Sequence, residues 1–276
     1  MCGMDLMEKL DQCDMVLVGL GEEFDGKARL RQIPEYVKGC GILEKEGLKW
    51  LIPFWNELCS EKLGESLLEQ SLARLTTLLE NKNYFVVSVS TNSRIAHHPW
   101  KNGRLVMPCG TVLRKQCGDG CRDVLSEVTE TEREELRERL IRMGERDSFQ
   151  DISGRYEAGS GGGQGEKLLG ICPKCGMPLV LNNVYAKAYN EDGYLERWRL
   201  YTKWLQGTLN HRLLVLELGV GMDFPSVVRW PFEKVTFFNQ KAFLCRVNEK
   251  LYQLTEELAE KGCGISQNAI DWLSRL

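Results

Sequence analysis

Four cysteines in two close pairs are the residues whose spacing most directly predicts a chemical role. Cys117 and Cys121 stand in CGDGC, and Cys172 and Cys175 stand in CPKCG. Two thiolates separated by two or three residues can turn toward one ion, and two such pairs complete a tetrahedral zinc site. Four protein ligands leave no position for water, so we expect a structural zinc. The alternative is a redox CxxC at the second pair, with the first pair incidental.

The cysteine total and the N-terminal residues bear on the compartment. The chain has 11 cysteines, an odd number, and begins with the polar stretch MCGMDLMEKLDQCD, which is unlike a signal peptide. A complete disulfide framework is therefore a poor explanation of the cysteines. Because no apolar run approaches the roughly 20 residues needed to cross a bilayer, we expect a cytoplasmic protein without a membrane partner.

Composition excludes a further class. The 276 residues are 43% hydrophobic and 27% charged, as in folded globular proteins. The net charge is -3, from 36 basic and 39 acidic residues. This balance gives no broad electropositive field for a phosphate backbone, so nucleic acid is not expected as the primary partner.

Short apolar runs that close on glycines indicate buried strands entering tight loops. Residues 14–21 read DMVLVGLG and end with Gly19-Leu20-Gly21, and residues 212–218 lead into Gly219-Val220-Gly221. Strand candidates and two helix candidates stand around these runs. The strands are YFVVSVS from Tyr84, then 104–109, 234–238 and 242–247, and the helices are 61–80 and 194–209. This alternation predicts a Rossmann-like α/β fold with a doubly wound, mainly parallel sheet.

The stretch 111–181 differs from the rest of the chain. It contains both cysteine pairs, a charged helix candidate over 130–142 and the glycine-rich loop GSGGGQG from Gly159. Such a loop has few side chains to pack and is expected to be flexible. We therefore expect a Rossmann-like domain over 1–110 and 182–276, with 111–181 inserted as a small zinc-ribbon module.

Several motifs in order resemble the sirtuin family. They are VLVGLG, VSVSTNSRI, MPCGTVLRKQC, the second cysteine pair, LELGVGMDFPSVVRWPFEKV and FLCRVNE. In sirtuins a Gly-Ala-Gly loop, a Thr-x-Asn-x-Asp strand end, a His-Gly before the first zinc cysteine, a Gly-Thr-Ser loop and a late asparagine follow in this order. The resemblance spans nearly the whole chain, and LELGVGMDFPSVVRWPFE is similar to a bacterial sirtuin-like branch. It implies an NAD-binding protein.

The resemblance implies a set of NAD contacts. Carried over by motif, they are Gly19 and Gly21 at the phosphates, Asn92 at the nicotinamide ribose, Gly219 and Gly221 in the Gly-Thr-Ser position, and Asn248 near the adenosine. A glycine permits close approach of the backbone to a ligand, where a Cβ would obstruct it.

The chain also departs from the family pattern at its catalytic positions. Cys109 precedes Gly110 where sirtuins have their histidine, and Arg94 replaces the aspartate of Thr-x-Asn-x-Asp. The first loop lacks the Gly-Ile-Pro-x-Phe-Arg continuation, and no Phe-Gly-Glu segment precedes Gly219. We assign Asn92 and Cys109 to the catalytic centre. Cys109 is a nucleophile or redox-sensitive thiol there, or else only a small side chain at a strand end.

The expected function is therefore an NAD-dependent transferase of sirtuin type with an altered catalytic centre, acting on a protein or peptide. It is either a protein ADP-ribosyltransferase or a lysine deacylase. A cysteine is a poorer base than histidine for the ribose hydroxyl step of deacylation, which favours ADP-ribosyl transfer. The alternative is a non-catalytic sensor or adaptor that binds NAD or ADP-ribose. The oligomeric state is not predicted.

Overall fold

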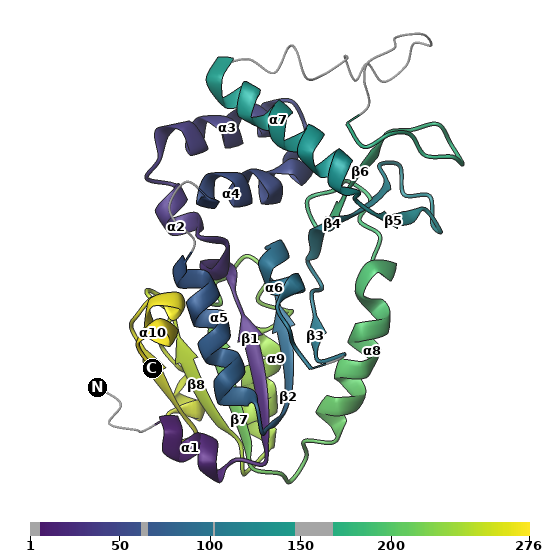
Figure 1. Cartoon of the computed structure of the whole chain (residues 1–276). Coiled ribbons are helices and arrows are strands. Elements are labelled where there is room, and N and C mark those ends of the chain that lie inside the picture. The colour runs from purple at the N-terminus through teal and green to yellow at the C-terminus, as the bar shows by residue number, and fades with distance from the viewer. Residues whose placement is uncertain (1–5, 62–65, 102, 147–167) are drawn as a thin grey trace. The chain divides into compact units, whose positions relative to one another are not determined.

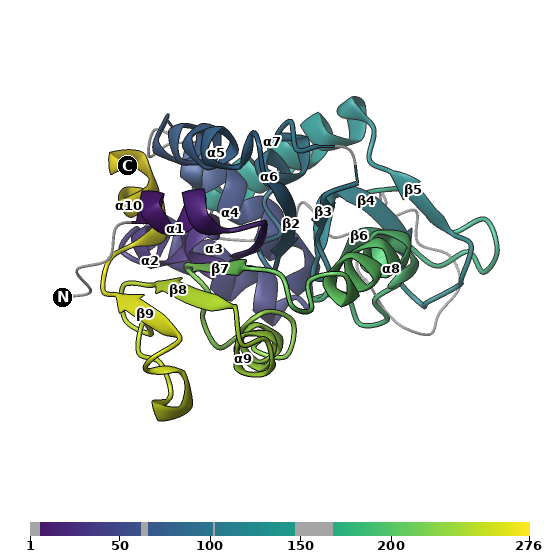
Figure 2. The same ribbon diagram turned by 90° about the horizontal axis from the view of Figure 1, so that it is seen from below.

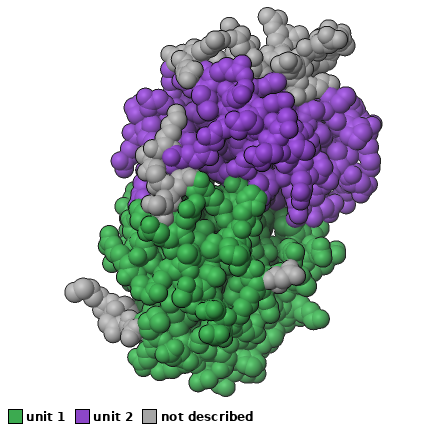
Figure 3. Space-filling model, in the orientation of Figure 1, with its two compact units in different colours: residues 1–27, 64–109, 194–276 green, residues 28–63, 110–193 purple. Residues whose placement is uncertain are grey.

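The computed structural model of the chain contains two compact units, each built from separated segments (Figure 1). It describes residues 6–61, 66–101, 103–146 and 168–276. Unit 1 comprises residues 1–27, 64–109 and 194–276, and unit 2 comprises 28–63 and 110–193 (Figure 3). Unit 2 is therefore larger than the module expected over 111–181, because it also contains 28–63.

Unit 1 is built on a six-stranded sheet in which every neighbouring pair is parallel. Its strands are β1 (Met15–Leu20), β2 (Asn83–Ser88), β3 (Leu105–Val106), β7 (Leu213–Leu218), β8 (Phe243–Val247) and β9 (Gly262–Ile265). The order β3-β2-β1-β7-β8-β9 is 3-2-1-4-5-6 when strands are renumbered along the chain. This is the order of dinucleotide-binding sheets, whose ligands bind beyond the carboxyl ends of the strands where the order reverses. Here that point lies between β1 and β7.

Both faces of this sheet are covered, which explains why its strands read as continuous apolar runs. Val16, Val18 and Leu20 of β1 join the core made with α5 (Ser66–Leu79) and α10 (Ala269–Arg275). On the other face lie α9 (Arg229–Phe238) and α8 (Asp192–Gln206), where Phe85 stacks against Tyr201 and Trp204. Figure 2 shows α5 and α10 on one side of the strands and α9 on the other. The short helices α1 (Leu6–Gln12) and α6 (Ser93–His97) complete the unit.

The expected strand over 234–238 is wrong, because these residues belong to helix α9. The run VTFF has strand-like composition. However, Arg229, Phe232 and Thr236 are buried at the three- and four-residue spacing of one helix face. Packing of that face against the sheet has overridden the local preference. The strand expected over 104–109 is present as the two-residue β3.

Unit 2 combines a small antiparallel sheet with helices around one apolar core. The sheet has the order β5-β4-β6, with β4 (Gly110–Cys117), β5 (Leu125–Glu127) and β6 (Leu179–Asn183). Its helices are α2 (Lys27–Leu30), α3 (Pro34–Lys45), α4 (Ile52–Glu61) and α7 (Glu130–Arg146). Tyr36, Trp55 and Leu140 are buried in this core. The helices of 28–63 thus supply apolar surface that the sheet alone does not have.

The GSGGGQG loop from Gly159 lies outside the described residues. Among the helices that the structure describes, none has both the length and the apolar character required to cross a bilayer.

Candidate functional site at the carboxyl edge of the parallel sheet

Two glycine loops meet beyond the ends of β1 and β7. The N–H of Gly21 donates to the carbonyl of Leu218 at 2.9 Å, and the N–H of Gly219 donates to that of Val247 at 2.7 Å. Gly219 has φ +63°, in the left-handed region that favours glycine. A Cβ on Gly21 would lie 2.2 Å from the carbonyl oxygen of Gly219. Both glycines are thus required for the two loops to touch.

Gly19 has a packing reason of its own. It lies within β1 and faces α9, where a Cβ would lie 2.5 Å from Val228 and 2.8 Å from Phe232. Close approach of the helix to the sheet therefore explains this glycine without a ligand. The structure gives Gly19 and Gly21 roles inside the protein, and their predicted contact with NAD phosphates stays a prediction.

The turn that follows Gly21 is strongly acidic and bonds to the loop after β7. This turn is the 3-10 helix η1 (Glu22–Asp25). The Glu22 carboxylate accepts hydrogen bonds from the backbone N–H groups of Gly221 at 2.5 Å and Asp223 at 3.2 Å. Lys27 lies 3.6 Å from Asp223. Backbone N–H groups of the kind that cradle phosphates are therefore already paired with a carboxylate.

Glu23 makes the equivalent connection to the loop after β8 and to the start of α10. Its carboxylate accepts from the N–H of Glu249 at 2.8 Å and from that of Ala269 at 2.6 Å. Burial raises the pKa of Glu23, although the two N–H donors oppose that shift. Glu22 and Glu23 thus connect the loops after β7 and β8, and the start of α10, to the turn that follows β1.

Asn92 occupies a capping position after β2. Its Oδ1 accepts from the N–H of Arg94 at 3.0 Å, which caps α6, and its Nδ2 donates to the carbonyl of Phe24 at 3.5 Å. Asn92 is 6% exposed. Arg94, at the position of the family aspartate, lies 3.7 Å from Glu69. The predicted ribose residue is therefore held by both α6 and η1.

Asn248 joins the loops after β8 and β7. Its Oδ1 accepts from the N–H groups of Lys250 and Leu251 at 2.9 and 2.7 Å, and its Nδ2 donates to the carbonyl of Val220 at 3.2 Å. Gly219, Gly221 and Asn248 are thereby brought together. All the predicted NAD-site residues lie at this carboxyl edge or, in the case of Gly19, on the strand that leads to it.

Cys109 is buried beside the same acidic turn, with 2% of its surface exposed. Burial strongly raises the pKa of its thiol, and the nearby carboxylates of Asp25 and Glu22 raise it further. A thiol in such surroundings is protonated at neutral pH. Cys109 therefore has the properties of a neutral buried side chain, and not those of an activated thiolate nucleophile.

Sequence reasoning missed a buried ion network beneath the glycine loops. Arg246 bonds to Glu217, with Nε to Oε1 at 2.7 Å, and to Glu233 at 2.7 Å, while Arg229 lies 3.2 Å from Glu217. Arg229 also donates to the carbonyls of Val220 and Leu251. Glu217 and Arg246 are register partners on β7 and β8. The available signal was one charged residue in each of two otherwise apolar strands.

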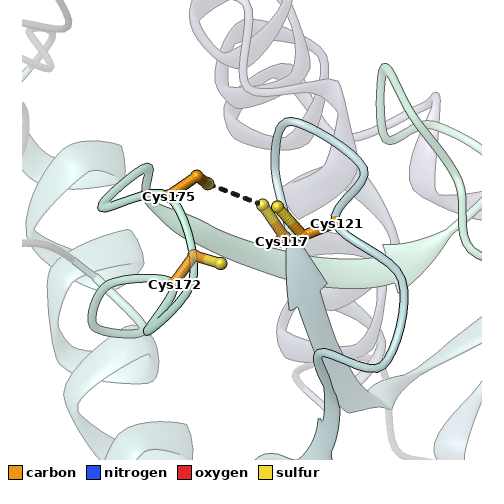
Figure 4. A group of neighbouring side chains, drawn as sticks. All are labelled: Cys117, Cys121, Cys172 and Cys175. Carbon is orange, nitrogen blue, oxygen red and sulfur yellow. Dashed lines mark hydrogen bonds between the residues drawn. The ribbon is translucent and has the colours of Figure 1, made fainter.

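The four predicted metal ligands come together in unit 2. The sulfur atoms of Cys117, Cys121, Cys172 and Cys175 all lie within 4.8 Å of one another, and those of Cys117 and Cys175 are 3.5 Å apart (Figure 4). Sulfurs bound to one tetrahedral zinc lie about 3.8 Å apart, given zinc–sulfur bonds of about 2.3 Å. The donor set and its spacing fit zinc.

Local backbone geometry supports each pair of cysteines. Gly120 and Gly176 have φ +78° and +73°, which lets the chain turn tightly at both pairs. The backbone N–H groups of Cys175 and Lys174 lower the pKa of Cys172 to about 7, against the effect of burial. The arrangement favours a metal over a lone redox pair, because all four sulfurs face one another.

A separate hollow lies at the opposite, amino edge of the sheet. Its volume is about 630 Å³, and Met15, Phe85 and Trp204 are among the residues that line it. None of the predicted site residues lines this hollow. It is therefore distinct from the candidate site.

Comparison with known proteins gives one curated relative and two solved structures of note. No known family profile matches the chain. It is 21% identical over 203 residues to a protein ADP-ribosyltransferase of Staphylococcus aureus (strain Mu50 / ATCC 700699), a match covering 72% of this chain and 58% of the relative. The chain thus spans little more than half the length of that relative.

Two of the similar solved structures are described as Sir2 proteins. One is a mutant Sir2 homologue in complex with ADP-ribose, with a TM-score of 0.50 and 12% identity, covering 99% of this chain and 96% of that one. The other is a mutant Sir2 with a p53 peptide and NAD, with a TM-score of 0.50 and 12% identity, covering 99% and 97%. At this level of identity the likeness concerns the fold alone.

Proposed function

Because this chain has the sirtuin fold, we propose that it is an NAD-dependent protein ADP-ribosyltransferase of sirtuin type. One observation carries the proposal. The loops that contain Gly21, Gly219 and Asn248 meet Asn92 and η1 at the point where the strand order of the sheet reverses. This is where doubly wound sheets bind nucleotides. The similarity to a protein named as an ADP-ribosyltransferase supports the same reaction.

The residues present supply polar groups suited to NAD. Asn92 would face the nicotinamide ribose, Gly219 and Gly221 the phosphates, and Asn248 the adenosine. NAD supplies an ADP-ribosyl group whose leaving group is nicotinamide. The carboxylate of Glu22, which accepts from the N–H groups of Gly221 and Asp223, competes with phosphate oxygens for these donors. The site therefore fits NAD best when the Glu22 side chain is displaced from these donors.

Transfer to a protein side chain suits this site better than deacylation. In transfer, the acceptor's lone pair forms a bond to ribose C1′, and nicotinamide leaves with the electrons of the C1′–nitrogen bond. The acceptor's proton passes to solvent. Deacylation additionally needs a base for a ribose hydroxyl. Cys109, buried and with a raised pKa, is a poor candidate for that role.

The sirtuin resemblance and the cysteine cluster also support a division of the chain into two domains. We propose that the NAD-binding domain lies within 1–110 and 182–276 and that 111–181 form a module held by one zinc, against which residues 28–63 pack. The fit of Cys117, Cys121, Cys172 and Cys175 to a tetrahedral site supports the zinc. Apolar side chains of 28–63 share one core with those of 111–181, so the module is part of a larger folded unit.

The decisive experiment measures NAD cleavage and transfer together. Purified protein is incubated with NAD labelled in its adenylate part, with and without a pool of proteins. Free nicotinamide and protein-bound label are then quantified. We expect both products in equal amount, and loss of both in Asn92→Asp, which keeps an acceptor for the N–H of Arg94 but removes the amide donor. Gln70→Ala, an exposed amide on α5, serves as the matched control and should retain activity. Absence of nicotinamide release under all conditions would refute the proposal.

A non-catalytic sensor of NAD or ADP-ribose is the second candidate. The buried, protonated character of Cys109 favours it, because no base stands at that position. This function requires binding without cleavage. It would be supported by an increase in melting temperature with ADP-ribose, since a ligand that binds only the folded state stabilises it. NAD would then remain intact in the same samples.

A further inference from the structure

A chain of hydrogen bonds links the acidic turn to Asn92. The hydroxyl of Ser90 donates to Oδ1 of Asp25 at 2.5 Å, and the N–H of Thr91 also donates to the Asp25 carboxylate. The oxygen of Ser90 in turn accepts from the N–H of Asn92 at 3.3 Å. Asp25 and Asn92 are each 6% exposed, and Ser90 is fully buried. These contacts form a continuous path inside unit 1.

A carboxylate at Asp25 determines which group donates and which accepts in each of these hydrogen bonds. An ionised carboxylate only accepts hydrogen bonds, whereas a hydroxyl both donates and accepts. In its ionised form, Asp25 therefore fixes the Ser90 hydroxyl as a donor toward itself. The lone pairs of Ser90 are left for the N–H of Asn92. An amide at position 25 could donate to Ser90 instead, and the direction would be lost.

A carboxylate at this position is costly for folding. Burying a charged group disfavours folding unless it is well paired. An ion pair with Lys27 at 3.7 Å and the hydrogen bonds from Ser90 and Thr91 offset part of this cost, whereas Glu22 adds a like charge nearby. Burial accordingly raises the pKa of Asp25. A costly buried group next to a predicted site residue is typical of functional sites.

We propose that Asp25 is a positioning residue of the transferase site, which sets the orientation of Asn92 through the hydroxyl of Ser90. The proposal rests on the proposed function and adds a residue that no part of the sirtuin resemblance assigned. The second anchor of Asn92, from Nδ2 to the carbonyl of Phe24, comes from the adjacent residue of the same turn. The two connections between Asn92 and η1 therefore depend on consecutive residues of η1, Phe24 and Asp25.

The test compares Asp25→Asn with Ser90→Ala and with their double variant. Asp25→Asn has nearly the same shape but carries no charge, and it can reverse the bond to Ser90. We expect kcat for nicotinamide release to fall about 10- to 100-fold, with KM for NAD within about threefold of the unmodified protein. The melting temperature should be unchanged or higher, because the buried charge is gone. The double variant should be no slower than the slower single variant, because residues that act as a unit are not additive.

Ser90→Thr keeps the hydroxyl and should recover part of the activity lost in Ser90→Ala. The matched control is Glu57→Gln, which neutralises another buried carboxylate, paired with Arg133 at 3.2 Å in unit 2. It is expected to change the melting temperature without changing kcat. Full kcat in Asp25→Asn, alongside a loss in Asn92→Asp, would overturn the role of Asp25 and leave the proposed function intact. Failure of the unmodified protein to cleave NAD would overturn both.

Discussion

Gly21 faces the backbone of Gly219 so closely that a methyl group on Gly21 would lie 2.2 Å from the Gly219 carbonyl oxygen. Gly21 itself has φ -102°, which any residue can adopt. Its need for glycine is therefore steric and arises from the neighbouring loop. The contact joins the ends of the two central strands.

We expect Gly21→Ala to destabilise the protein by about 1–3 kcal/mol, because the loops must separate to admit the methyl group. Urea unfolding measures the change. Gly41→Ala is the matched control, since a Cβ at Gly41 of α3 meets no atom within 4 Å. It should be stabilising by about 0.5–1 kcal/mol. If Gly21→Ala kept full stability yet lost NAD binding, the glycine would serve the ligand and not the loop contact.

The cysteine cluster predicts about one zinc per chain after purification without added metal. Elemental analysis measures the stoichiometry, and a zinc-free protein would contradict the assignment. Cys172→Ser should lose the metal and lower the melting temperature by roughly 5–10 °C, because the energy of metal binding contributes to folding. Cys40→Ser, a change at a cysteine outside the cluster, should keep the zinc.

Glu22 is expected to weaken NAD binding. Its carboxylate accepts from the N–H groups of Gly221 and Asp223, which are the donors assigned to the phosphates. Glu22→Gln removes a negative charge there, so we expect NAD affinity to rise about three- to tenfold. Calorimetric titration of both proteins provides the measurement. Glu249→Gln, an exposed residue that uses its backbone N–H to contact Glu23, is the control and should change affinity little. Weaker binding in Glu22→Gln would show that the carboxylate assists the ligand.

Cys109→His should create NAD-dependent deacylation, because an imidazole with a pKa of about 6.5 can take a proton from a ribose hydroxyl. Loss of acetyl groups from a peptide pool measures it, together with NAD affinity, which should change little. Cys109→Ser should keep ADP-ribosyl transfer within about threefold, since a buried protonated thiol is no nucleophile. If either change abolishes an activity of the unmodified protein, Cys109 takes part in that activity and is not only a buried side chain.

The ion pair between Asp14 and Arg212 predicts a pH dependence of stability. Hydrogen bonds from Arg212 lower the pKa of Asp14 from 3.8 to about 2. A group whose pKa is lower in the folded state contributes stability above its unfolded pKa and loses it as the pH falls through the folded value. Asp14→Asn should therefore melt at a lower temperature than the unmodified protein at pH 7. Melting curves should show this gap closing between about pH 4 and pH 2. A gap at pH 2 as large as the gap at pH 7 would contradict the assignment.

The parallel sheet could be predicted because its strands are buried on both faces and contain few polar residues. The same reasoning could not find β9, whose sequence is GCGI. Its glycines are explained only by tertiary contacts, since a Cβ at Gly262 or Gly264 would lie 2.6 Å or 2.2 Å from the carbonyl oxygens of Leu244 and Tyr252. The sequence of a short glycine-containing segment does not indicate which backbone atoms will pack against it.

The candidate site was predictable where a motif matched, and not where it departed. Asn92 and Asn248 were selected by resemblance and lie at the expected edge. Glu22 and Asp25 stand where the family pattern is absent, so the resemblance assigned them nothing. Three acids in the four residues after Gly21 were the available signal, but their partners are separated from them by 65 to 246 residues in the chain.

The position of β1 between β2 and β7 has a consequence for biosynthesis. β1 pairs with β2 early in the chain, but its other edge stays open until β7 emerges from the ribosome, 130 residues after Ser88. At 5–20 residues per second, this interval lasts roughly 7 to 26 seconds. During that time the nascent chain exposes an apolar strand edge of the kind that recruits chaperones or aggregates. Translation speed across residues 89–218 should therefore govern the yield of folded protein.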